Sequence, residues 1–200
     1  MDIISDYRAM DRSQVGGKFH VQARLRAEGI PVPDFFCLGR TLFDRLMAPE
    51  LPRIRHLLAG LTPERRNDVV AVSKTIQQLI TQDLQVDVAA IEAIFAAYDE
   101  VLGDARLVSV RACMLSDNAE GNEDSVANPF AGISESFLYV TREQVLDRVR
   151  ECWASAFAEK TLIYRLSQGM DPLDVGVAVG IQRMVFGERS FVLFTADPNT

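Results

Sequence analysis

The sequence predicts an α+β fold, because helix-like and strand-like segments are mixed along the chain without regular alternation. Apolar residues recur at helical spacing through one long block, residues 41–103, which we interpret as a helical insertion. Short apolar runs rich in β-branched and aromatic residues flank this block, at 34–38 and 107–110. The pattern therefore favours α+β or irregular α/β over a doubly wound parallel sheet.

The composition is typical of a soluble globular protein with a sizeable core: of 200 residues, 48% are apolar and 24% are charged. The chain has 21 Lys and Arg and 28 Asp and Glu, which gives a net charge of -7. This charge argues against nucleic-acid binding, which needs a surplus of cations. No apolar run approaches the ~20 residues of a membrane span, and the N-terminus lacks a secretory signal. We therefore expect a cytoplasmic protein with neither nucleic acid nor membrane among its partners.

The N-terminal part is predicted to contain one helix and one strand. Gly16-Gly17 precedes apolar residues at helical spacing, which predicts a helix over 18–28. Two prolines within residues 30–33 force an extended backbone, and residues 34–38 follow as a predicted strand.

Within the helical block, capping residues indicate the starts of two helices. Thr62 is predicted to be an N-cap with Pro63 at the first helical position, for a helix that runs to about residue 85. Asp87 is predicted to cap the next helix, which ends at Gly103.

Beyond residue 106 the strands return. Residues 107–110 predict a short buried strand that carries Arg111 at its end, and the polar, acidic residues 116–129 predict a loop. Thr141 and Gln144 match a capping box at the start of a long helix that ends at Gly169. Further strands are predicted at 137–140, 175–185 and 191–195.

Gly16-Gly17-Lys18 is the first candidate binding site. Glycines allow the backbone to approach an anion, the amides of a helix start carry partial positive charge, and a lysine adds a full charge. The motif does not fit GxxxxGK[ST], because Phe19 stands where Ser or Thr is needed. The alternative interpretation is a flexible turn before a helix.

Arg111 is the second candidate, because a guanidinium at the end of a buried strand is costly unless an anion or a carboxylate meets it. The alternative is a structural ion pair with Asp117 or Glu120. A catalytic role for His20 or His56 has no support from neighbouring residues, and Cys113 is interpreted as a small buried residue rather than a reactive thiol.

Taken in order, the segments resemble the N-terminal nucleotide-binding region of the phosphoenolpyruvate synthase, pyruvate phosphate dikinase and rifampin phosphotransferase family. The resemblance covers essentially the whole chain, and the main matching stretches are 15–18, 29–33, 108–111, 130–132, 152–157, 164–165, 177–179, 182–185 and 194–200. It implies an ATP-grasp fold with a mixed, largely antiparallel sheet, of which residues 1–200 would be the N-terminal part.

The resemblance also implies roles for individual residues. Lys18 and Arg111 would hold the triphosphate of ATP, and Gly132 would bring a loop backbone over the phosphates. Ser136 stands where the family usually has a threonine that contacts them. Gln182, with Met184 and Val185 on the same strand, would border the adenine.

Two departures from the family pattern concern the phosphates. Residues 111–115 read Arg-Ala-Cys-Met-Leu where the family usually has Arg-Ser-Ser-Ala-Thr, and residues 132–136 lack the two glutamines that commonly follow the glycine. Hydroxyls that could bind phosphate oxygens are therefore missing. A changed acceptor, a weak ATP affinity and a loss of catalysis all remain open as consequences.

The function implied is that of an ATP-dependent phosphotransferase, which phosphorylates a histidine and then a small acceptor such as pyruvate. The Mg²⁺ ligands and a swivelling phosphohistidine domain are expected outside these 200 residues, so we expect the chain alone to be inactive. The alternatives are a biosynthetic ligase on the same scaffold and a non-catalytic nucleotide-binding or regulatory module.

Overall fold

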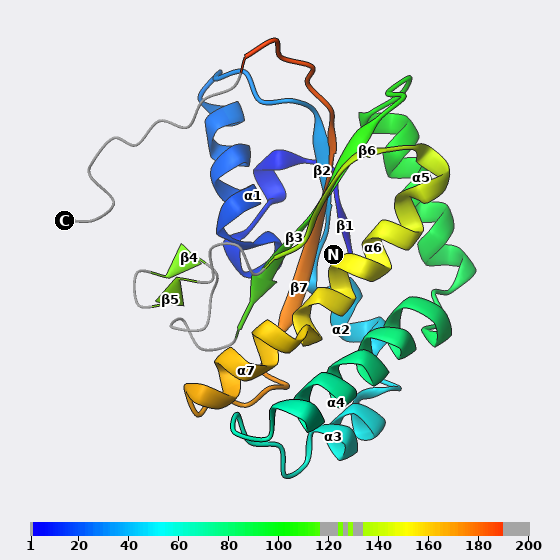
Figure 1. The fold of residues 1–200 in the computed structure, drawn as a ribbon. Coiled ribbons are helices and arrows are strands. Elements are labelled where there is room, and N and C mark those ends of the chain that lie inside the picture. The colour runs from blue at the N-terminus through cyan, green and yellow to red at the C-terminus, as the bar shows by residue number, and fades with distance from the viewer. Residues whose placement is uncertain (1, 117–123, 126–127, 130–133, 190–200) are drawn as a thin grey trace, which may run out of the picture.

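An antiparallel five-stranded sheet forms the centre of the fold, with the strand order β1-β2-β7-β3-β6 (Figure 1). The computed structural model describes residues 2–116, 124–125, 128–129 and 134–189. The strands of this sheet are β1 (Ile3–Ile4), β2 (Phe35–Leu38), β3 (Val108–Leu115), β6 (Ser136–Val140) and β7 (Gly176–Arg183). A separate pair is formed by β4 (Asp124–Ser125) and β5 (Asn128–Pro129). The α+β prediction is confirmed.

Helices cover both faces of the sheet. One face carries α1 (Arg12–Ala27), preceded by the short 3₁₀ turn η1 (Tyr7–Ala9). Between β2 and β3 lie α2 (Arg40–Met47), α3 (Leu51–Leu58), α4 (Arg66–Gln78), the π-helical turn η2 (Leu79–Asp83) and α5 (Val88–Val101). After β6 come η4 (Arg142–Gln144), α6 (Val145–Ala154), η5 (Ser155–Phe157) and α7 (Glu159–Ser167). Figure 1 shows α1 on one side of the strands and α5 and α6 on the other.

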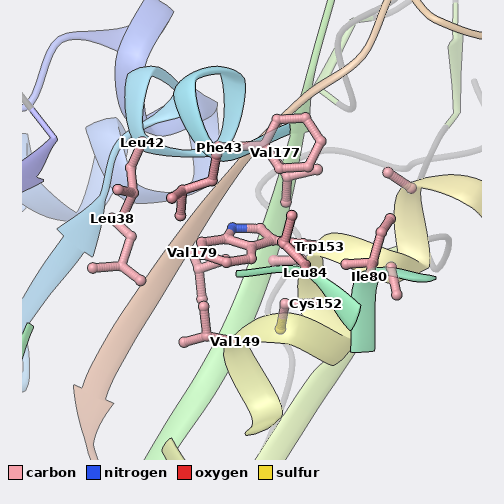
Figure 2. Packing of buried hydrophobic residues seen from close by; sticks show 14 of the residues in the cluster. Leu38, Leu42, Phe43, Ile80, Leu84, Val149, Cys152, Trp153, Val177 and Val179 are labelled. Carbon is pink, nitrogen blue, oxygen red and sulfur yellow. The ribbon is translucent and has the colours of Figure 1, made fainter. Parts of the chain in front are cut away.

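The larger apolar core lies on the face opposite α1, where alternate residues of the strands meet the helices. Trp153 on α6 lies in this core beside Phe43 on α2, with 6.4 Å between their ring centroids, and Figure 2 shows both rings close to Val177 and Val179 of β7. A smaller core lies under α1 and includes Phe19, Cys37 and Cys113, all fully buried.

Several local predictions are confirmed. Asp87 caps α5 by accepting a hydrogen bond of 2.7 Å from the backbone N–H of Ala90. The capping box of Thr141 and Gln144 precedes α6, and β2 and β6 form where strands were predicted.

Other predictions of boundaries are wrong. Thr62 is not an N-cap, because α4 begins only at Arg66 and residues 62–65 form a turn. The helix predicted up to Gly169 is two helices, since Ala158 is extended (ψ 150°) between them. The last predicted strand, 191–195, lies outside the described residues.

The correction that matters most concerns β3, which continues to Leu115 instead of ending before Arg111. Its whole length pairs with β7, from Val108 opposite Arg183 to Leu115 opposite Gly176. The local sequence indicated only four strand residues here. Pairing with β7, which is more than sixty residues away in the chain, extends β3 beyond them. Arg111 therefore lies in the middle of a central strand.

Candidate functional site

The first part of the site is a kink in α1. This helix begins at Arg12, earlier than predicted, and Gly16 interrupts it with φ 75° and ψ 168°. A side chain at Gly16 would overlap the Sγ of Cys113 on β3, so only glycine allows this approach and this backbone conformation. The helix resumes at Gly17, and its first turn therefore lies against β3, with Lys18 in that turn.

Lys18 reaches the sheet from this turn. Its Nζ donates a hydrogen bond of 2.8 Å to the carbonyl oxygen of Ala112. The N–H of Ala112 in turn donates to the carbonyl oxygen of Glu135, 2.9 Å away, in the segment that leads into β6. The half-buried ammonium is therefore held at the place where β6 joins β3.

Arg111 lies beside this contact. It is opposite Gly180 of β7 and opposite Ser136 of β6. Because side chains alternate along a strand, Arg111 is on the same sheet face as Cys113, which packs under Gly16. Lys18 and Arg111 therefore belong to one region, on the face that α1 covers.

The guanidinium of Arg111 makes no ion pair with a carboxylate of the described residues. Asp117 and Glu120, the alternative partners considered from the sequence, lie outside those residues. Ser136 is exposed, and its pairing with Arg111 places its side chain on the same face. Gly132 lies outside the described residues.

The side chain of Gln182, the residue expected to border the adenine, joins three segments of the fold. It is buried, and its Nε2 donates to Oε1 of Gln22 at 2.8 Å and to the carbonyl oxygen of Pro33 at 3.2 Å. The amide thus holds α1 and the proline-containing segment against β7. No sequence pattern singled out Gln22, which is 160 positions from Gln182.

Met184 and Val185 follow Gln182 but lie beyond the end of β7 at Arg183, not on the strand as predicted. The N–H of Met184 donates to the carbonyl oxygen of Leu107 at 3.3 Å, which keeps this segment beside the start of β3. The side chain of Val185 is 65% exposed. An exposed apolar side chain at this end of the sheet can contact the face of a flat ring.

Residues 12–200 match the family described as pyruvate phosphate dikinase, AMP/ATP-binding domain. The chain belongs to this family. The resemblance inferred from the ordered motifs is confirmed.

Relatives of the pyruvate phosphate dikinase family match almost the whole chain. It is 31% identical to rifampicin phosphotransferase of Bacillus cereus, over 98% of this chain and 23% of that protein. It is 33% identical to rifampicin phosphotransferase of Bacillus subtilis, over 94% of this chain and 21% of that protein. It is also 33% identical to a probable phosphoenolpyruvate synthase of Archaeoglobus fulgidus, over 98% of this chain and 26% of that protein. The chain spans about a quarter of the length of these curated relatives.

Ala112 and Cys113 follow Arg111 directly on β3. Both side chains are fully buried, Ala112 in the larger core and Cys113 under α1. Ala112 makes its contacts through its backbone: the carbonyl oxygen accepts from Lys18 and the N–H donates to Glu135, a role that no residue pattern could reveal. The interpretation of Cys113 as a small buried residue is confirmed.

The remaining titratable candidates have structural or surface positions. Nδ1 of His20 lies 2.9 Å from the carbonyl oxygen of Met10, and His56 is exposed on α3. Burial raises the pKa of the Cys37 thiol well above its usual value, and the nearby Cys113 adds to this shift. In the part of the chain that the structure describes, no three His, Cys, Asp or Glu side chains come together as a metal site. The same part contains no helix that is long and apolar enough to cross a membrane.

Proposed function

We propose that this chain is the nucleotide-binding part of an ATP-dependent phosphotransferase, in which Lys18 and Arg111 hold the triphosphate. The observation that carries this proposal is the hydrogen bond from Lys18 Nζ to Ala112, the residue that follows Arg111. This bond brings the ammonium of Lys18 to the residue next to Arg111, and the proposal is that the two cations share one anionic ligand although the net charge of the chain is -7. A cationic pair with exposed hydroxyl neighbours such as Ser136 suits a phosphate group.

The dimensions of the sheet agree with a nucleotide lying along it. Arg111 is opposite Gly180, and Met184 follows four positions further along the chain. At ~3.3 Å per residue these two positions are roughly 13 Å apart, which leaves room for a ribose between triphosphate and base. Because the amide of Gln182 is already bonded to Gln22, we assign adenine contact to Met184, Val185 and the backbone around them.

The glycine pair would supply further phosphate contacts. After the kink at Gly16 the helix starts again, and a helix start carries partial positive charge. Lys18 is on the same helix start. Gly132, in the loop before Ser136, is proposed to cover the phosphates through its backbone.

For the whole protein we propose phosphoryl transfer from ATP to a histidine of a separate swivelling domain, and then to a small acceptor such as pyruvate. Support comes from the relatives, which are named as rifampicin phosphotransferases and probable phosphoenolpyruvate synthases. Mg²⁺ would neutralise the transferring group, with ligands outside these 200 residues, while Lys18 and Arg111 position it. Residues 1–200 would be the N-terminal part of the nucleotide-binding domain, with residues 41–103 inserted.

Calorimetric titration of the chain with ATP and Mg²⁺ tests the proposal. We expect Arg111→Met to weaken ATP binding by at least about tenfold, since a charge-assisted hydrogen bond to phosphate is lost. Arg53→Met, which removes an exposed arginine of α3, is the matched control and should bind like the unmodified chain. Equal ATP affinities of the two variants, both folded, would contradict the proposed role of Arg111.

Phosphoryl transfer is tested in the full-length protein with ATP labelled in its phosphates. Label should appear on a histidine and then on an added acceptor, and the 200-residue chain alone should transfer none. A folded full-length protein that binds ATP but labels no histidine would contradict the phosphotransferase assignment.

A further inference from the structure

A cavity lies on the face of the sheet opposite α1, and so on the other face from the proposed nucleotide site. Its volume is about 440 Å³, within the range of small-molecule pockets. It lies between α4, the π-helical turn η2, α6 with η5, and the start of β6. Phe137 and Ala158 contribute apolar lining, and the other described lining residues are largely polar or charged.

The charges of this cavity come from different elements. Lys74 is on α4, Glu151 is on α6, and Glu135 immediately precedes β6. Glu151 is held by Arg148 at 2.8 Å, whereas Glu135 lies 3.7 Å from Lys160 and is 46% exposed. Lys74 makes no ion pair with any residue that the structure describes. The cavity therefore offers an ammonium on one wall and a weakly paired carboxylate on another.

We propose that this cavity binds a small zwitterionic amino acid with an apolar side chain. The carboxylate of the ligand would meet Lys74, with Gln77 or Gln78 of the same helix as hydrogen-bond donors. The ammonium would meet Glu135. The apolar side chain would lie against Phe137, where its burial is favourable. A ligand with only one charge would contact only one of the two charged walls.

The cavity is connected to the proposed nucleotide site through three consecutive residues. Glu135 and Phe137 line the cavity, whereas Ser136 between them lies opposite Arg111 on the other face. The carbonyl oxygen of Glu135 accepts the N–H of Ala112, the residue to which Lys18 is bonded. A ligand that immobilises Glu135 and Phe137 therefore acts on the strand pairing that places Arg111. The cavity is a regulatory site, and this part of the inference rests on the proposed function.

The test measures ligand binding by thermal unfolding and by the fluorescence of Trp153, the single tryptophan, which adjoins Ala154 of the cavity lining. The probes are L-leucine and L-phenylalanine. The analogues 4-methylpentanoate and 3-methylbutylamine keep the leucine side chain but carry only one charge. Because ligands that bind the folded state raise its stability, the amino acids should raise the unfolding temperature, and each analogue should bind at least about tenfold more weakly.

Two cavity variants, Lys74→Met and Ala158→Leu, together with one control, Arg53→Met, separate binding in this cavity from nonspecific binding. Lys74→Met should weaken L-leucine binding by about tenfold, whereas Arg53→Met, an exposed cation elsewhere, should not change it. Ala158→Leu should abolish binding by filling the cavity. The absence of binding by both amino acids, or binding by Lys74→Met and Ala158→Leu that equals binding by the unmodified chain, would overturn the proposal.

Regulation is tested by titrating ATP in the presence and absence of L-leucine. A changed ATP affinity that disappears in Ala158→Leu is expected. If L-leucine binds but leaves the ATP affinity unchanged, the regulatory role is refuted. If ATP does not bind at all while L-leucine does, the proposed nucleotide function fails and the amino-acid site stands.

Discussion

The ammonium of Lys18 donates a hydrogen bond of 2.8 Å to the carbonyl oxygen of Ala112, 94 positions further along the chain. Because Ala112 also donates its N–H to Glu135, one residue of β3 joins the start of the resumed helix to the segment before β6. Arg111, the neighbour of Ala112, is on the sheet face that α1 covers, next to this contact. The approach of Lys18 to the residue beside Arg111 is the geometric basis of the proposed phosphate site.

Lys18 and Arg111 are expected to act on ATP as one unit. Each single variant, Lys18→Met and Arg111→Met, should weaken ATP binding, and the double variant should lose less than the sum of the two. For neighbouring residues with a shared ligand, the coupling free energy should be about 0.5–3 kcal/mol. Calorimetry of the four proteins measures it, with circular dichroism as the folding control. Strictly additive effects would mean that the two cations do not share one phosphate group.

Gly16 is expected to be irreplaceable because of what lies beside it, in addition to its φ of 75°. In Gly16→Ala the new methyl group overlaps the Sγ of Cys113, so we expect a loss of about 2–4 kcal/mol in the free energy of unfolding. Gly60→Ala is the matched control, since Gly60 has φ 73° and no atom within 4 Å of the added methyl. It should lose only about 1 kcal/mol. Urea unfolding checks both, and equal losses would show that the contact with Cys113 contributes nothing.

Gln182 is expected to stabilise the fold through its buried amide. Gln182→Leu removes the donor to the carbonyl oxygen of Pro33 and to Oε1 of Gln22, which should cost about 1–3 kcal/mol. Gln22→Leu should cost less, because Gln182 keeps its bond to Pro33. Chemical denaturation of the two variants measures the difference. A larger loss in Gln22→Leu than in Gln182→Leu would contradict this ranking.

The buried thiol of Cys152 is expected to make stability depend on alkaline pH. Burial raises the pKa of Cys152 far above the ordinary thiol value of 9.0. The unfolded chain therefore releases the thiol proton at lower pH than the folded chain, and the stabilisation, complete below about pH 9, is lost as pH rises further.

Urea unfolding between about pH 8 and about pH 10 measures this loss. Above that window Arg165 opposes it, because burial lowers the pKa of this base to about 10 and deprotonation then favours the folded state. Cys152→Ala should show a shallower fall in stability with pH than the unmodified chain. Parallel pH profiles would argue against a contribution from this thiol.

Local features of the sequence predicted most of the elements and their type. Asp87, Thr141 and Gln144 were sufficient to locate two helix starts, because a capping side chain acts on backbone groups within three residues. Boundaries that depend on distant partners were predicted poorly. The end of β3 at Leu115 was missed because its pairing with β7 supplies the strand hydrogen bonds there.

Some residues of the candidate site could also be predicted from the sequence. Lys18 and Arg111 stood out because a lysine beside two glycines and an arginine next to a buried strand both need an anionic partner. The contribution of Ala112 could not be predicted from the sequence, since every residue type has a backbone carbonyl group. The hydrogen bonds from Gln182 to Gln22 and Pro33 depend on the packing of α1 against β7, which the periodicity of the sequence does not reveal.

The sequence by itself determined the α+β class, the family and the two candidate cations, because composition, caps and ordered motifs act over short distances. Only the tertiary structure decided that Lys18 and Arg111 occupy the same region. Their proximity requires the pairing of β3 with β6 and β7 and the close contact of Gly16 with Cys113, and both depend on residues far apart in the chain.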